Sequence, residues 1–323
     1  MPISRKNEYT EDYAIMSTAG SSVSWLHRLG SLVAVMTFLM LMSGALAASA
    51  ESSTSISPWA AFANGADQAG KYAHIFGILA LTVTLLTVIF TACLWRSSSP
   101  RYLKTLSYVS VVVLFATMLA DLNFVRSAIP ATAAAAYTIG TQIFFCLTVC
   151  IALFTRTDWR WDEVKTPDLA SPSIRQVLVF TTAAIFVQPF LGEGFRKKGI
   201  GIAPHLVVGI AATVCSLWVL EMALTKFSRL REFKISAIFL GELVGLQLFL
   251  GLVDYSMVLN ARAARGAQPG LTVMNVTHAA VGTLVLATSL FVTFQAFKYL
   301  APAGNRAPAT IIPEYQEGEP LED

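Results

Sequence analysis

Charge is scarce in this chain of 323 residues, of which 13% are Asp, Glu, Lys or Arg and 55% are hydrophobic. A soluble domain of this size carries roughly twice that share of charge. Together with a mean hydropathy of +0.60, several apolar runs of about 20 residues, the length that crosses a bilayer as a helix, predict a multi-spanning membrane protein. The net charge of +3 gives no support to nucleic-acid binding.

Cysteine and histidine are also rare, with four residues of each. Cys93, Cys146, Cys150 and Cys215 all fall inside apolar runs, so no disulfide framework is expected. The sequence has no glycine-rich phosphate loop, no cysteine cluster with zinc spacing and no Ser/His/Asp arrangement that a membrane placement would allow. These absences leave the histidines as the residues that carry most information about chemistry.

Eight apolar segments predict an all-α integral membrane protein with eight transmembrane helices in two pseudo-symmetric four-helix bundles. The predicted spans are 29–48, 73–95, 105–125, 134–154, 176–192, 203–225, 235–257 and 274–298. The polar linker 156–175 is expected at the membrane surface, between an N-terminal bundle in 1–155 and a C-terminal bundle in 176–299. The acidic, Pro-rich tail 300–323 is expected to be flexible.

The distribution of positive charge predicts the orientation of the helices. Of the 23 Lys and Arg residues, 16 fall in the N-terminal segment, the even-numbered connections and the tail, and seven fall on the other side. Both termini are therefore expected in the cytoplasm, in an inner (cytoplasmic) membrane protein. The stretch 44–50 resembles a signal-peptide cleavage site, but the long charged segment before it favours an uncleaved first helix.

A repeated pattern in the C-terminal half suggests a cofactor. The two copies are Gln188-Pro-Phe-Leu-Gly192 with His205-x-x-Val-Gly209, and Gln247-Leu-Phe-Leu-Gly251 with His278-x-x-Val-Gly282. Two histidines at matching membrane depth suggest axial ligands of one haem b, and the glycines four residues later leave room on the same helix face for a flat macrocycle. In the alternative reading the glycines only pack helices and the histidines only join polar networks.

Charged residues near this repeat give weaker indications. Arg196, Lys197 and Lys198 precede His205, and Arg262 and Arg265 precede His278. They are placed to meet haem propionates near the outer face, although ordinary solvation explains any one of them equally well. An acid within a span is costly, so Glu242 is a candidate for a proton path or a quinol pocket, whereas Glu221 can reach Lys226 at the interface.

The repeat resembles the heme A synthase family of integral-membrane proteins. The resemblance rests on Gln188-x-x-Leu-Gly192, Arg196, His205, Gln247-x-x-Leu-Gly251 and His278, and covers most of residues 176–298. It implies two pseudo-symmetric four-helix bundles, with a haem b between His205 and His278 in the C-terminal one. In that family the N-terminal bundle binds the haem whose methyl group is oxidised.

The N-terminal half departs from the family at the residues that carry its chemistry. His74-Ile-Phe-Gly77 matches the histidine that opens the second helix, but Lys71 replaces the catalytic glutamate and Ala136–Gln142 lacks the fourth-helix histidine. His74 could hold a second, five-coordinate haem, with Tyr137, Thr141 or Gln142 opposite it. Equally, this half could bind no haem.

Three functions remain open at this stage. The first is a membrane b-type cytochrome that transfers electrons through a bis-histidine haem, as a subunit of a respiratory complex or with an electron-donor protein or quinol as partner. The second is a divergent but active heme A synthase, an oxidoreductase. The third is a haem-free assembly or scaffold protein. Whether the protein is an enzyme thus depends on the N-terminal half.

Overall fold

The computed structural model describes residues 6–50, 68–124, 131–159, 161, 165–196, 199–264 and 270–302. Within these residues the chain forms eight helices and two short strands. They are α1 (Lys6–Ala50), α2 (Gln68–Arg96), α3 (Arg101–Phe124), α4 (Ala131–Phe154), β1 (Thr166–Asp168), α5 (Ile174–Arg196), α6 (Ala203–Thr225), α7 (Arg231–Ala264), α8 (Leu271–Tyr299) and β2 (Leu300–Pro302).

Each of the eight helices contains a segment that is long and apolar enough to cross a membrane. The shortest such segment is Tyr137–Phe154, with 18 residues, and the longest is Arg231–Ala261, with 31. The prediction of an all-α integral membrane protein with eight membrane-capable helices is therefore confirmed. The helices run past the predicted spans, and α1 starts at Lys6 instead of residue 29, because hydropathy marks the apolar part of a helix and not its polar ends.

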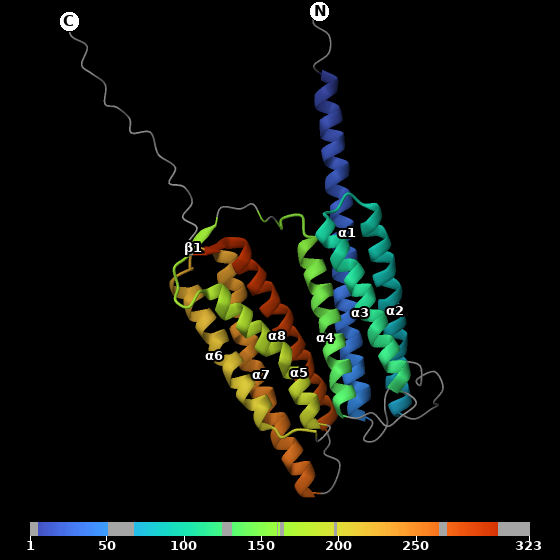
Figure 1. The fold of residues 1–323 in the computed structure, drawn as a ribbon, viewed down its shortest axis with the longest axis vertical. Coiled ribbons are helices and arrows are strands. Elements are labelled where there is room, and N and C mark those ends of the chain that lie inside the picture. The colour runs from blue at the N-terminus through green and yellow to red at the C-terminus, as the bar shows by residue number, and fades with distance from the viewer. Residues whose placement is uncertain are drawn as a thin grey trace, which may run out of the picture.

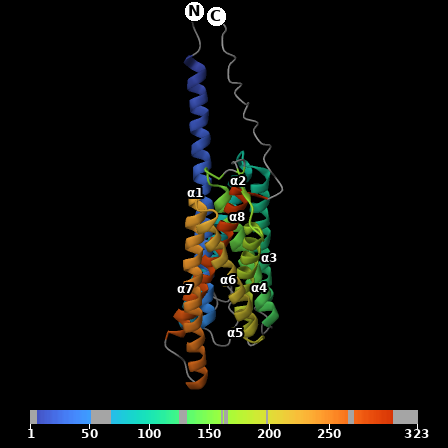
Figure 2. The same ribbon diagram turned by 90° about the vertical axis from the view of Figure 1, so that its left-hand side faces the viewer.

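The helices pack in two groups of four, α1–α4 and α5–α8, which meet where α1 and α4 contact α5 and α8 (Figures 1 and 2). Within each group the first helix also contacts the fourth. The division into two domains and the pseudo-symmetry of the bundles stay predictions. We call the end with β1 and the starts of α3, α5 and α7 the linker end, and the opposite end, where α2, α4, α6 and α8 start, the histidine end (Figure 1).

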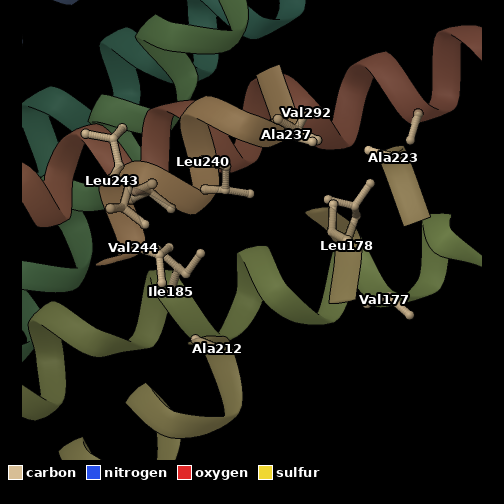
Figure 3. Close-up of a cluster of buried hydrophobic side chains, with 14 of the residues drawn as sticks. Val177, Leu178, Ile185, Ala212, Ala223, Ala237, Leu240, Leu243, Val244 and Val292 are labelled. Atoms are coloured by element: carbon tan, nitrogen blue, oxygen red, sulfur yellow. The ribbon is translucent and has the colours of Figure 1, made fainter. Parts of the chain in front are cut away.

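The core of the second group is apolar and close-packed. Figure 3 shows how Leu178 and Ile185 of α5 approach Leu240 and Val244 of α7, with the small side chain of Ala212 on α6 nearby. Leu178 and Leu240 are fully buried. Alanines at such contacts let helices approach closely, which favours association in lipid, where burial of apolar surface supplies no driving force.

A structured cap closes the linker end of the second group. β1 and β2 pair in parallel, with Thr166 opposite Leu300 and Asp168 opposite Pro302. Residues 300–302, expected to begin the flexible tail, therefore form part of the fold. The rest of the tail, 303–323, lies outside the described residues. The pairing forms because the linker crosses the end of α8. There the backbone groups of β2 replace water as the hydrogen-bond partners of the linker backbone.

Two buried charged side chains hold this cap in place. Asp168 is 1% exposed and accepts hydrogen bonds from the Ser173 hydroxyl and the backbone N–H of Ala170. Lys298 is 5% exposed and donates to the backbone carbonyl of Asp158 at 3.3 Å and to the Tyr299 hydroxyl at 3.2 Å. A charged group is stable at such depth only when hydrogen bonds like these compensate for the water that it loses on burial.

Replacing Asp168 with alanine is expected to lower the melting temperature of the protein in detergent. The change leaves the Ser173 hydroxyl and the Ala170 N–H without their acceptor, at a cost of about 1–3 kcal/mol. Asp158→Ala is the matched control, since its ion pair with Arg156 is exposed and worth less than about 1 kcal/mol. Thermal unfolding followed by tryptophan fluorescence compares the two, and equal melting temperatures would show that the Asp168 contacts do not stabilise the cap.

Candidate functional site

His205 and His278 both lie near the start of their helices, at the histidine end. His205 is the third residue of α6, which begins with a proline in its first turn, and His278 is the eighth residue of α8. Both side chains are half-buried. The two histidines therefore lie at the same end of the α5–α8 group, on α6 and α8. We call these two residues and the side chains around them the candidate site.

In the first copy of the repeat, α5 supplies both neighbours of α6. Gly192 lies against the ring of His205, because a Cβ atom at this glycine would be 3.5 Å from the ring Cε1. Gln188, one turn deeper on α5, lies against Gly209, where a Cβ would be 3.1 Å from its Nε2. The same Nε2 donates to the backbone carbonyl of His205 at 3.2 Å.

The second copy repeats these contacts between α7 and α8. A Cβ at Gly251 would lie 3.1 Å from Cε1 of His278, and one at Gly282 would lie 2.9 Å from Nε2 of Gln247. Here the glutamine Nε2 is 3.3 Å from Nε2 of His278 itself. The sequence repeat is therefore also a repeat of contacts, in which one glycine packs on a histidine and the other on a glutamine in each copy.

Four buried polar atoms in this site have no hydrogen-bond partner. They are Nδ1 of His205, Nδ1 of His278, Oε1 of Gln188 and Oε1 of Gln247. Leaving a buried polar group unsatisfied costs about 1–3 kcal/mol. Four more such atoms lie elsewhere among the described residues, but only the atoms of this site form matched pairs in the two copies of the repeat. This pattern is typical of a site built for a ligand or for a second arrangement of the same side chains.

A polar rim borders the site at the histidine end. Arg196, at the end of α5, forms an ion pair with Glu193 at 3.0 Å. The amide of Asn275, turned so that its nitrogen faces Asp254 of α7, donates to Oδ1 of this acid at 2.6 Å. Lys197, Lys198 and Arg265 lie outside the described residues, and the side chain of Arg262 is not described.

Sequence reasoning missed part of this site. Gln188 and Gln247 were quoted in the motif but given no role, although each stands one turn before a glycine that packs on a histidine. The rim residues Asp254 and Asn275 are not part of the repeated motif. The signal that could have found them is spacing, because Asn275 lies three residues before His278 and so on its face of α8.

The N-terminal half has a different interior at the corresponding depth. His74 and Lys71 are exposed on α2. The ring of Phe76 is buried and packs against α1, where a Cβ at Gly44 would lie 3.1 Å from it. Met40, Leu114 and Phe144 complete this apolar cluster. Thr141 and Gln142 of α4, two of the residues expected opposite His74, are buried.

The other polar candidates lie apart from the histidine pair. Nδ1 of His27 on α1 donates to the backbone carbonyl of Ala152 at 2.9 Å, which ties α1 to α4 near the linker end. Glu242 is exposed on α7, and Glu221 is exposed on α6 and accepts from the Thr225 hydroxyl. Among the described residues, no group of three or more His, Cys, Asp or Glu side chains is arranged to hold a metal ion.

Comparison of the sequence with protein-family models and with curated proteins gave no match.

Proposed function

We propose that the protein is a membrane b-type cytochrome, whose α5–α8 group holds one haem b between His205 and His278. The observation that supports this most is the duplicated set of contacts, in which a glycine packs on each histidine and a second glycine packs on a glutamine. A haem between two imidazoles needs room on both faces, and only glycine leaves that room without separating the helices.

The donor set fits this group. Both imidazoles have a buried ring nitrogen without a partner, and a ligating histidine normally gives its second nitrogen to an acceptor. The partnerless Oε1 atoms of Gln188 and Gln247 are acceptors of the right kind in the same site. Arg196 at the rim supplies a cation for anionic substituents. When bound through two histidines, a haem b accepts and gives up single electrons and has no free coordination position for oxygen.

The protein's own residues would control that electron transfer. The histidines hold the iron, while leucine and valine side chains of the surrounding core exclude water from the inner side of the site. The Arg196–Glu193 pair and the Asp254–Asn275 contact place charged groups at the rim. Electrons would therefore enter and leave at the histidine end, from a quinol, a donor protein or a neighbouring respiratory subunit.

A divergent heme A synthase is the less supported alternative. The resemblance that suggests it rests on the C-terminal half, whereas the oxidised haem would lie in the N-terminal one. There His74 is exposed and the Phe76 ring fills the place beside Gly44. The feature in its favour is the buried Gln142, whose Oε1 has no partner.

One haem per chain is the expected result for protein purified from cells that make haem. A pyridine haemochrome assay with a reduced-minus-oxidised spectrum gives this ratio, and His74→Ala should leave both the ratio and the spectrum unchanged because this side chain lies outside the proposed site. A ratio of zero would reject the cytochrome and leave the scaffold function. A ratio of two that falls to one in His74→Ala would favour the alternative, which the formation of oxidised haem in cells then tests.

A further inference from the structure

One face of α7 combines features that lipid alone does not explain. Ile235, Phe239, Leu246 and Phe249 are each between 45% and 62% exposed. Glu242 and Gly245 lie among them and are exposed as well. Positions 235, 239, 242, 246 and 249 follow one another by three or four residues, and Gly245 is three residues after Glu242, so the six positions form a single stripe along the helix. We call this stripe the Glu242 face; α7 packs against α6 and α8 with its other sides (Figure 2).

Glu242 lies well inside the membrane-capable part of α7. Lys234, the last cation at the linker end of this helix, precedes it by eight residues, which is about 12 Å along the axis. Asp254 follows it by twelve residues, or about 18 Å. A carboxylate at this depth costs several kcal/mol unless it is paired, and intramembrane acids normally face another protein group. Within the described part of the chain, Glu242 makes no hydrogen bond or ion pair.

The two glycines of this region have different surroundings. Gly241 packs on α6, where a Cβ would lie 2.9 Å from Leu220. Gly245, one turn further, has nothing within 4 Å of an added Cβ. Since glycine weakens a helix interior and packs nothing here, its use on an exposed face is unexplained inside this chain. Small residues spaced by four are the usual means by which transmembrane helices approach one another closely.

We propose that the Glu242 face binds a transmembrane helix of a different protein, which carries an arginine or lysine at the depth of Glu242. The carboxylate supplies the charge that such a side chain needs inside the bilayer, and Gly245 lets the two backbones approach. A second copy of this chain fits less well, because a two-fold contact would bring Glu242 against Glu242. This interaction does not depend on haem in the C-terminal bundle.

The test uses the full-length protein in vesicles of phosphatidylcholine and phosphatidylglycerol, with a donor dye attached at its C-terminus. The probes are two acceptor-labelled Leu/Ala helices, identical except that one has arginine and the other leucine about eight residues from its polar end. Energy transfer is measured as peptide is added. An interhelical polar contact of about 1–2 kcal/mol corresponds to half-saturation by the arginine helix at a roughly 5- to 30-fold lower mole fraction.

Variants assign this preference to the proposed residues. Glu242→Leu should bind both helices equally, and Gly245→Ile should weaken binding of the arginine helix because the backbones cannot approach. Glu221 is an exposed acid on α6, and Glu221→Gln should behave as wild type.

Equal binding of both helices by the wild type would overturn the proposal. So would self-association of the protein that Glu242→Leu abolishes, which would make a second copy the occupant. The haem spectrum of Glu242→Leu should match wild type, so failure here is separable from failure of the cytochrome function.

Discussion

Replacing His278 with alanine is expected to remove the low-spin haem signal completely, and His205→Ala is expected to do the same. In the proposed site each imidazole would be one of the two histidine ligands of the haem, and neither of the other two histidines lies there to replace it. His74 is exposed on α2, and His27 is bonded to the Ala152 carbonyl near the opposite end of the bundle. A haem left with one histidine becomes high-spin or is lost.

His27→Ala is the matched control, because it removes a half-buried histidine and its hydrogen bond to a backbone carbonyl without touching the site. Electron paramagnetic resonance of the oxidised protein and the reduced optical spectrum measure the low-spin centre. Circular dichroism and size-exclusion chromatography confirm that each variant is folded. A low-spin signal of normal size in both His205→Ala and His278→Ala would reject the ligand assignment.

The second large effect is expected at Gly282. A Cβ at this position would lie 2.9 Å from Nε2 of Gln247, so even alanine forces the glutamine to move. Leucine would fill the space that the proposal gives to the macrocycle. We therefore expect Gly282→Ala to reduce the haem-to-protein ratio and Gly282→Leu to bring it close to zero, with an overpacking cost of about 1–3 kcal/mol in stability.

Gly245→Leu is the control for this prediction, since it places the same side chain on a neighbouring helix in open space. Its haem-to-protein ratio should equal that of wild type. The ratio is measured by pyridine haemochrome, together with the melting temperature. Full haem occupancy in Gly282→Leu would contradict the proposed position of the haem, whereas a fall of both ratio and melting temperature in Gly245→Leu would show that leucine disturbs the fold in general.

Much of the fold could be predicted because a membrane constrains the composition of each helix separately. Each span must be apolar over about 20 residues, whatever packs beside it, and all eight predicted spans correspond to helices. The ends of the helices were less predictable. The polar first part of α1 and the β1–β2 pair depend on contacts that hydropathy does not record.

The candidate site could be predicted only in part. The spacing of Gln188 to Gly192 and of His205 to Gly209 marked the residues, because a repeat is visible without knowing the packing. The contacts that connect the glutamine of one helix to the glycine of the next join residues 21 and 35 positions apart in the sequence. No local pattern shows which glycine will face which side chain.

His74 and Glu242 are two residues whose side-chain orientation could not be predicted from the sequence. His74-Ile-Phe-Gly77 resembles the start of a ligand helix, yet in α2 the histidine is exposed and Phe76 is buried. Glu242 was considered for a proton path or a quinol pocket, yet it lies on the outer face of α7. In both cases the residue type and depth were readable, but the direction in which the side chain points depends on the neighbouring helices.

The sequence by itself determined that this protein is helical, that it enters the membrane with eight spans, and that two histidines occupy matching places in a repeat. Those properties follow from composition and spacing along one helix at a time. Only the tertiary structure decided that each histidine packs beside a glycine of the preceding helix and has a buried ring nitrogen without a partner, whereas Phe76 is buried in an apolar cluster of the N-terminal half. The physical reason is that a binding site consists of surfaces from several helices, and their relative rotation is set by packing.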